Sequence, residues 1–233
     1  MAREGKSGVG AGASGGSRGL TERVKTARKR KPSSTAWLNR QLNDPYVREA
    51  QRLGYRSRSA FKLLQIDDKY RVLVPGARVL DLGAAPGGWC QVAAQRVGPR
   101  GRVVGVDLQP VEPVAGAELL VGDATEPEAV ATLRAALGGG ADVVLSDMAN
   151  AATGHSGTDQ ARTMALAEAA AEVAVDLLAP GGAFVVKVLQ GPDEPQLFDR
   201  LRRAFAHVRR VKPKASRADS KELYLVATGF KGG

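Results

Sequence analysis

Residues 79–89 read Val-Leu-Asp-Leu-Gly-Ala-Ala-Pro-Gly-Gly-Trp, an apolar run that stops at an acid and then enters a glycine-rich turn. A helical pattern from Cys90 to Val97 follows the turn. A β-strand that passes through a tight glycine turn into a helix N-terminus creates a nucleotide-type ligand site at its carboxyl end. The stretch therefore predicts an α/β fold with a ligand site at this turn.

The residues of the turn indicate which ligand it suits. A dinucleotide fingerprint has the pattern G-x-G-x-x-G, and its middle glycine lets the backbone approach a pyrophosphate. Here the frame runs from Gly83 to Gly88 and has Ala85 at the middle position, while Pro86 lacks the N–H group that a phosphate could use. The turn favours a ligand without a diphosphate, such as S-adenosylmethionine. The alternative is an ordinary strand-to-helix turn whose glycines only allow close packing.

Strand and helix patterns alternate along the rest of the chain. Strands are expected at residues 78–82, 102–107, 118–121, 142–146, 183–188, 207–212 and 223–229. Helices are expected at residues 57–69, 88–97, 127–137, 159–178 and 195–205. This alternation predicts a Rossmann-like, seven-stranded and mostly parallel sheet with helices on both faces. The last two strands lack a crossover helix between them, so they should pair antiparallel.

The charge is unevenly distributed between the two ends of the chain. Residues 1–62 hold 15 Lys and Arg against 4 Asp and Glu, whereas the remaining residues hold 19 against 20. Residues 1–33 are rich in Gly, Ser, Arg and Lys, which predicts a disordered basic tail before a domain at 34–233. The block Arg28–Lys31 suits a phosphate-binding arm, although such blocks also serve only to keep a tail solvated.

Aromatic and basic residues interleave after Ser34, a mixture that suits base stacking and phosphate contacts. They are Trp37, Arg40, Tyr46, Arg48, Arg52, Tyr55, Arg56 and Arg58. The expected partner is nucleic acid.

Other compositional features limit the class of protein. The single cysteine, Cys90, allows no internal disulfide, and His155 and His207 have no neighbouring Cys or His, so no metal site is expected. The sequence has no run of 18 apolar residues and no apolar signal region at its N-terminus. We expect a cytoplasmic monomer without a membrane or metal partner.

Two acids at predicted strand ends are candidates for adenosine contacts. Asp107 closes the second strand, 24 positions beyond Gly83, where an acid can accept hydrogen bonds from ribose hydroxyls. Asp123 follows the third strand and can face the adenine amino group. Either acid could instead be a helix N-cap.

Two further strands end in charged residues. Asp147 follows the apolar run 142–146, and Lys187 interrupts the run Val-Val-Lys-Val at 185–188. A cation is unusual on a buried parallel strand and requires a partner. We expect that partner to be Asp147 or Glu222.

The sequence of residues 81–89 resembles that of the FtsJ/RrmJ family of RNA ribose 2'-O-methyltransferases. The resemblance extends from Arg52 to Lys231 and includes Tyr-Arg-Ser-Arg-Ser-Ala-Phe-Lys at 55–62. It implies a methyltransferase fold, a cofactor pocket and a catalytic tetrad. The tetrad positions are Lys62, Asp147, Lys187 and Glu222, and the cofactor positions are Gly87, Trp89, Asp107, Asp123 and Asp147.

The resemblance also implies roles for the tetrad. Lys187 would act as the base that takes the proton of the 2'-hydroxyl, and Lys62 beside it would favour its neutral form. Asp147 would orient Lys187 near the methyl donor, and Glu222 would hold the two lysines. In one respect the chain differs from the family, because Asn150 follows Ser-Asp-Met-Ala directly, without the usual proline. We expect a more flexible loop there.

The implied function is S-adenosylmethionine-dependent methylation of a uridine ribose 2'-hydroxyl in large-subunit ribosomal RNA, on an assembled or assembling particle. Three alternatives stay open: a tRNA ribose methyltransferase, a non-catalytic RNA-binding factor for ribosome assembly, and a nicotinamide-dependent oxidoreductase. The intact tetrad argues against the second alternative. Ala85 and the lack of a second catalytic domain argue against the third.

Deleting residues 1–33 should weaken binding to RNA or ribosomal subunits, because this segment carries much of the basic excess but none of the predicted site residues. The remaining affinity should depend less steeply on salt, since fewer phosphates are contacted. Binding measured across a salt series checks this. Equal affinities for both proteins at every salt concentration would rule out such a role for the tail.

Overall fold

The computed structural model describes residues 39, 41–150 and 153–232. The chain divides into a first unit, Met1–Asp44, and a second, compact unit, Pro45–Gly233. The basic tail, Trp37 and Arg40 lie outside the described residues, so their expected roles stay predictions. The second unit contains every predicted site residue and is described below.

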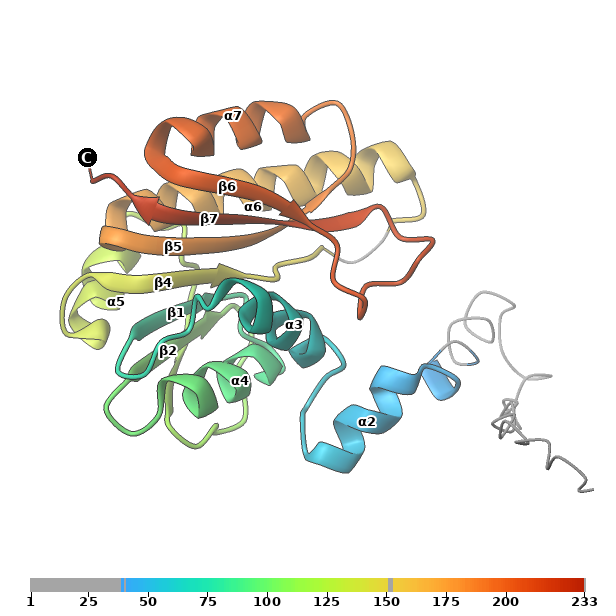
Figure 1. Ribbon diagram of the computed structural model, residues 1–233, viewed down its shortest axis with the longest axis horizontal. Coiled ribbons are helices and arrows are strands. Elements are labelled where there is room, and N and C mark those ends of the chain that lie inside the picture. Colours follow the sequence, from blue (N-terminus) through green and yellow to red (C-terminus); the bar gives the residue numbers. More distant parts are fainter. Residues whose placement is uncertain (1–38, 40, 151–152, 233) are drawn as a thin grey trace, which may run out of the picture. The chain divides into compact units, whose positions relative to one another are not determined.

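A seven-stranded sheet forms the centre of the second unit (Figure 1). Its strands are β1 (Arg78–Leu82), β2 (Arg102–Asp107), β3 (Ala117–Val121), β4 (Ala141–Ser146), β5 (Leu178–Leu189), β6 (Phe205–Val211) and β7 (Glu222–Phe230). The strand order is β3-β2-β1-β4-β5-β7-β6. Strands β1 to β5 pair in parallel, and β7 lies antiparallel between β5 and β6. The predicted fold class is confirmed.

The described part of this unit has six helices. They are α2 (Pro45–Leu53), α3 (Ala60–Tyr70), α4 (Gly88–Val97), α5 (Ala129–Leu137), α6 (Ser156–Leu177) and α7 (Glu194–Ala204). The sequence did not predict α2, because the helix is only nine residues long and buries only Ala50. Strand β5 begins directly after α6, five residues earlier than predicted, and so includes the Pro180-Gly181-Gly182 segment.

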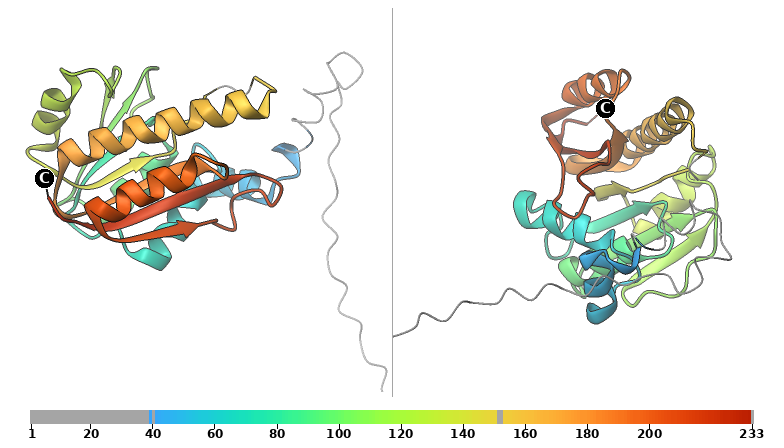
Figure 2. Two further views of the ribbon diagram at one scale, coloured as in Figure 1. Left: turned by 90° about the horizontal axis from the view of Figure 1, so that it is seen from above. Right: turned by 90° about the vertical axis from the view of Figure 1, so that its right-hand side faces the viewer.

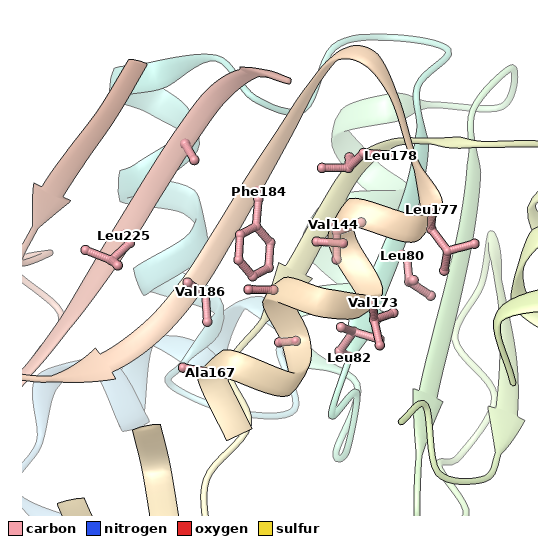
Figure 3. Packing of buried hydrophobic residues seen from close by; sticks show 14 of the residues in the cluster. Leu80, Leu82, Val144, Ala167, Val173, Leu177, Leu178, Phe184, Val186 and Leu225 are labelled. Carbon is pink, nitrogen blue, oxygen red and sulfur yellow. The ribbon is translucent and has the colours of Figure 1, made fainter. Parts of the chain in front are cut away.

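The helices cover both faces of the sheet (Figure 2). One buried cluster joins α5, α6 and α7 to Leu80, Phe184 and Val186 (Figure 3). A second cluster joins α3 and α4 to Val79 and Val185 on the opposite face. Neighbouring residues of a strand point to opposite faces. Each strand of the sheet centre is therefore apolar on both sides, as expected for parallel strands covered twice.

This alternation determines where the charged residues of the strands lie. Lys187 shares the face of Val185, which is the face covered by α3 and α4. Tyr224 of β7 pairs with Lys187 across the strands and belongs to the same cluster as Val185. The helix that carries Lys62 therefore packs on the side of the sheet to which Lys187 points.

The turn after β1 needs a glycine at position 83 for two reasons. Gly83 has a φ of 75°, and a Cβ atom there would lie 2.4 Å from Cγ of Met148, in the segment that follows β4. The turn and that segment thus approach each other more closely than any side chain at position 83 would allow. This close approach brings the glycine turn beside Asp147.

Replacing Gly83 with alanine should lower the free energy of unfolding by roughly 2–4 kcal/mol. Alanine is disfavoured in the left-handed conformation, and its Cβ atom would overpack against Met148. Gly76→Ala is the matched control: its φ is 86°, but no atom lies within 4 Å of the added Cβ. The control should cost only about 1–2 kcal/mol. Denaturant unfolding of both variants checks this. Equal losses in the free energy of unfolding would show that the Met148 side chain moves aside at no energetic cost.

Candidate active site

Lys187 reaches the carboxyl end of the sheet and meets Asp147 there. Its Nζ atom lies 3.1 Å from Oδ1 of Asp147 and donates to the backbone carbonyl of the same residue at 2.7 Å. Both side chains are mostly buried, with 8% of Lys187 and 17% of Asp147 exposed. The structure therefore supplies the partner that the sequence requires for Lys187, and of the two expected carboxylates it is Asp147.

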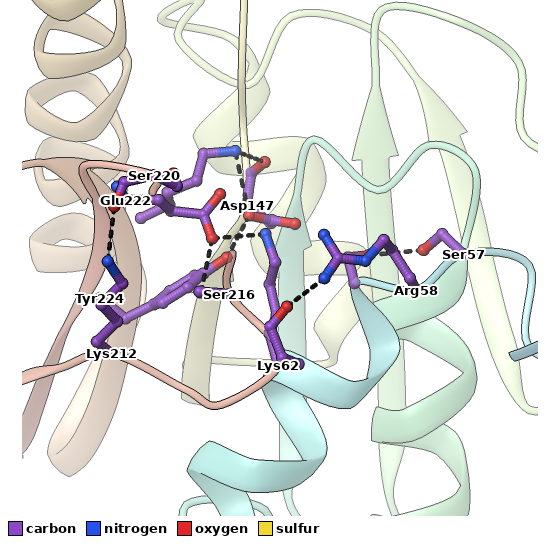
Figure 4. Close-up of polar contacts among 12 residues, drawn as sticks. Ser57, Arg58, Lys62, Asp147, Lys212, Ser216, Ser220, Glu222 and Tyr224 are labelled. Atoms are coloured by element: carbon purple, nitrogen blue, oxygen red, sulfur yellow. Dashed lines mark hydrogen bonds and ion pairs between the residues drawn. The ribbon is translucent and has the colours of Figure 1, made fainter. Parts of the chain in front are cut away.

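A second ion pair lies beside the first. Nζ of Lys62, on α3, is 2.7 Å from Oε1 of Glu222, at the first residue of β7. The same oxygen accepts a hydrogen bond from the Ser216 hydroxyl at 2.9 Å. Figure 4 shows Lys62, Asp147 and Glu222 converging at this edge of the sheet. The family resemblance implies that Glu222 holds both lysines, whereas in the structure each lysine has its own carboxylate.

Tyr224 connects the two pairs. Its hydroxyl donates to Oδ1 of Asp147 at 2.8 Å, and Nζ of Lys62 lies 5.7 Å from the centre of its ring. Burial, followed by the negative charges of Asp147 and Glu222, raises the pKa of Tyr224 well above its usual range. Tyr224 therefore stays a neutral donor and fixes one Asp147 oxygen. The sequence analysis missed this residue, although it lies two positions after Glu222 and so on the same face of β7.

The glycine turn lies next to these pairs and is held from outside by one arginine. The Arg56 guanidinium donates to the carbonyls of Pro86, Glu112 and Pro113. Gly87 has a φ of 105°, and a Cβ there would lie 2.8 Å from this guanidinium. Arg56 thus joins the turn to the segment that follows β2, and a side chain at position 87 would displace it.

Asp107 connects the same turn to the end of β2. Its Oδ2 accepts from the backbone N–H of Ala85 at 2.9 Å, and its Oδ1 accepts from that of Gln109 at 2.9 Å. Each carboxylate oxygen has a second lone pair, so a ribose hydroxyl can still be bound. The position agrees with the expected ribose contact, which stays a prediction.

Asp123 is exposed and forms a local turn rather than a helix N-cap. Its Oδ1 accepts from the backbone N–H and the hydroxyl of Thr125, at 2.9 and 2.7 Å. These hydrogen bonds lower the pKa of its carboxyl group. Asp123 is therefore ionised at neutral pH and can accept a hydrogen bond from an amino group.

Trp89 is buried and makes its contacts inside the protein. Its side chain is 3% exposed, its Nε1 donates to the Ser59 carbonyl at 2.9 Å, and its ring centre lies 5.8 Å from that of Tyr224. The indole therefore connects α4 to the segment before α3 and supports Tyr224. A cofactor contact by Trp89 stays a prediction.

Asp81 is a buried acid that the sequence analysis did not assign to the site. It is 1% exposed, its Oδ2 accepts from the Cys90 thiol at 3.2 Å, and its Oδ1 has no hydrogen-bond partner among the described residues. Burial raises its pKa to about 7; the Cys90 hydrogen bond opposes this shift, and the charges of Asp147 and Asp107 reinforce it. Cys90 is thus a hydrogen-bond donor as well as a small buried residue.

The aromatic and basic residues of 46–58 have contacts inside the protein. Tyr46 and Tyr55 both pack on the ring of Phe61, with ring centres 5.3 and 5.8 Å away. Arg58 donates to the Ala215 carbonyl, and Arg52 pairs with Glu49 at 2.6 Å. The spacing of these residues in the sequence could not distinguish packing inside the protein from a nucleic-acid surface, because both favour the same mixture of aromatic and basic residues.

The described residues have neither a metal-binding cluster nor a membrane-spanning helix. They contain no group of three or more His, Cys, Asp or Glu side chains arranged to hold a metal ion. None of their helices combines the length and the apolar character needed to cross a membrane.

The free energy of unfolding should fall as the pH rises from about 4 to about 7. Asp81 keeps its proton up to about pH 7 in the folded protein, whereas the unfolded chain loses it near pH 3.8. In this window the unfolded state binds fewer protons, so Asp81 contributes a decline of up to roughly 1.4 kcal/mol per pH unit.

The measurement is denaturant unfolding at several pH values, for the wild type and for Asp81→Asn. The variant should lack this contribution, so the difference between the two proteins should change with pH below 7 and level off above it. If the free energies of unfolding of the two proteins instead changed in parallel with pH, Asp81 would already be ionised at low pH.

Comparison with known proteins agrees with this geometry. The family model described as FtsJ-like methyltransferase matches residues 55–230. A protein of Paramagnetospirillum magneticum named ribosomal RNA large subunit methyltransferase E is 56% identical over 229 residues, 96% of this chain and 94% of the relative. A protein of the same name from Jannaschia sp. is 58% identical over 225 residues, 93% of this chain and 95% of the relative.

Solved structures show the same fold. A crystal structure from Plasmodium falciparum that carries the name ribosomal RNA methyltransferase has a TM-score of 0.68 and 28% identity, covering 77% of this chain and all of that one. Aeropyrum pernix fibrillarin, solved with bound S-adenosylmethionine, has a TM-score of 0.52 and 20% identity over 75% of each chain. The fold, the match over most of the chain and the relatives together identify this protein as a member of the FtsJ-like methyltransferase family.

Proposed function

We propose that this protein transfers the methyl group of S-adenosylmethionine to the 2'-hydroxyl of a uridine ribose in large-subunit ribosomal RNA. The observation that carries the proposal is the pair of buried ion pairs, Lys187 with Asp147 and Lys62 with Glu222, beside a glycine turn at the carboxyl edge of the sheet. Substrates of open α/β sheets bind at this edge.

The residues around the turn fit the cofactor. Gly83 and Gly87 keep the backbone free of side chains, and Asp81 presents a buried oxygen without a partner among the described residues. Asp107 and Asp123 have remaining acceptor capacity for the ribose and adenine groups. Bound S-adenosylmethionine supplies a methyl group already activated on a sulfonium, which leaves as a neutral thioether.

The chain's own residues then have two tasks, to align the ribose oxygen and to take its proton. In its neutral amine form Lys187 would accept the hydroxyl proton on Nζ while the ribose oxygen takes the methyl group that the bound cofactor would supply. The resulting ammonium is the form that pairs with Asp147, and it must release its proton to solvent before the next transfer. Asp147 holds the Lys187 amine through its carboxylate and its backbone carbonyl, so the lone pair has a defined direction. Lys62, held by Glu222, places a positive charge beside the site.

The ribosomal substrate is inferred from relatives that share 56% and 58% identity over nearly the whole chain and are named for the large-subunit RNA. A tRNA substrate is the second candidate, and activity on isolated tRNA against large subunits separates the two. A non-catalytic assembly factor would gain little from two buried ion pairs, which cost desolvation energy. All four charged residues of the site come from one chain, which suits a monomer that meets ribosomal particles in the cytoplasm.

Replacing Lys187 with alanine should lower the rate of methyl transfer at least ~10²–10⁴-fold, as typical for loss of a general base. Binding of S-adenosylmethionine, measured by calorimetry, should stay near the wild-type value, because the adenosine contacts come from other residues. Lys187→Arg should be equally inactive, since arginine keeps the charge but cannot deprotonate.

Lys62→Arg is the matched control, because arginine can keep the ion pair with Glu222. It should retain much more activity than Lys187→Arg. A Lys187→Arg variant near the wild-type rate would mean that Lys187 only positions the hydroxyl. An active Lys187→Ala variant would place the catalytic centre elsewhere.

A further inference from the structure

The basic excess of the chain is not confined to its first quarter. Residues 63–199 hold nine Lys and Arg against eighteen Asp and Glu, whereas residues 200–221 hold nine Lys and Arg against Asp219 alone. This second basic segment includes the end of α7 from residue 200, β6 and the β6–β7 loop, residues 212–221. The loop leads directly into Glu222 at the site.

The β6–β7 loop is held in one conformation by contacts at both ends and in the middle. Lys212 donates from Nζ to the carbonyls of Ala218 and Ser220, at 3.1 and 2.7 Å. In the middle, the N–H of Ala215 donates to Oε1 of Gln65 at 2.9 Å, and its carbonyl accepts from Arg58. Both of these partners come from the α3 region, which also supplies Lys62.

The loop presents two uncommitted ammonium groups next to the site. Lys214 precedes Ala215 and the buried Ser216, whose hydroxyl binds Glu222, and Lys221 immediately precedes Glu222. Both lysines are exposed, and neither ammonium group makes a hydrogen bond or an ion pair with a residue that the structure describes, although the backbone carbonyl of Lys221 accepts from the N–H of Gln190 at 2.9 Å. Glu194, which could have balanced this region, is buried and pairs with Arg210 at 2.9 Å.

We infer that the β6–β7 loop is a fixed phosphate-binding rim of the RNA site, where Lys214 and Lys221 contact backbone phosphates of the nucleotides near the target ribose. This inference rests on the proposed function and names the surface through which that site holds its substrate. An RNA chain whose ribose reaches Lys187 carries negative charge on both sides of that ribose. A rim already fixed by Gln65, Arg58 and Lys212 can bind it without ordering a loop first.

The chemistry of the rim favours an RNA backbone over a protein partner. Lysine is a flexible point charge suited to phosphates, without the planar fork that arginine uses for carboxylates. The loop at 212–221 contains no aromatic residue, so this surface offers charge rather than stacking. Its contribution should be independent of base sequence and sensitive to salt.

The test compares Lys214→Gln/Lys221→Gln with the control Arg202→Gln/Arg203→Gln in the full chain. The control removes the same charge from two exposed residues at the end of α7. They lie just before Phe205, the first residue of β6. Phe205 pairs with Phe230, at the opposite end of β7 from Glu222. The probes are large ribosomal subunits and their naked RNA from a strain without the gene. Binding is measured over a salt series, and methylation gives KM and kcat.

For the lysine variant we expect a KM for RNA on the order of 10-fold higher, a kcat near the wild-type value and a salt slope lower by roughly 1.5 for two lost phosphate contacts. The control should differ little from the wild type. Equal effects in both variants, no effect, or loss of binding to subunits but not to naked RNA would each overturn the inference. Wild-type protein that binds RNA through these lysines yet methylates none would instead contradict the proposed function alone.

Discussion

A buried ammonium group must be paired with a carboxylate, and the carboxyl edge of this sheet is organised around two such pairs. Lys187 and Lys62 are both more than nine-tenths buried, so each would be costly without Asp147 or Glu222. The four residues come from α3, β5, β7 and the segment after β4. A shift in any of these elements would leave a charge unpaired, so the requirement fixes how they pack.

The remainder of the site follows from that requirement. Tyr224 fixes one oxygen of Asp147, and the buried Trp89 supports Tyr224 from the first turn of α4. Since α4 begins at the glycine turn, the cofactor side and the lysine side of the site are mechanically connected. Gly83 allows the turn to approach Met148, next to Asp147 in the chain. Arg56 then holds the turn from its outer side.

The sequence predicts the sheet well because its signals there are local. The bounds of β1, β2 and α4 agree with prediction, since apolar runs end at acids or glycines. Lys187 and Asp147 were recognisable as charges at the ends of apolar strands. Helix α2, by contrast, is short and buries only Ala50. Its aromatic and basic residues suggested a nucleic-acid surface, but in the structure Tyr46 packs on Phe61.

Apart from the pairing of Lys187 with Asp147, most contacts between distant segments could not be predicted. Nothing in the spacing of Arg56 indicates that it binds three carbonyls, two of them more than 50 residues away. The separate pairing of the lysines depends on the relative positions of α3 and β7. The hydrogen bond from Cys90 to Asp81 joins residues nine positions apart, but only the turn geometry brings them together. Such contacts depend on the complete fold.

The central claim is that the two buried ion pairs form the active site of an RNA ribose methyltransferase. Mapping 2'-O-methyl groups in all cellular RNA, from strains with and without the gene, tests it most directly. One uridine of large-subunit ribosomal RNA should lose its methyl group in the strain without the gene. The methyl group should return with the wild-type gene and stay absent with the Lys187→Ala variant. Unchanged methylation in every RNA, or restoration by that variant, would contradict the account.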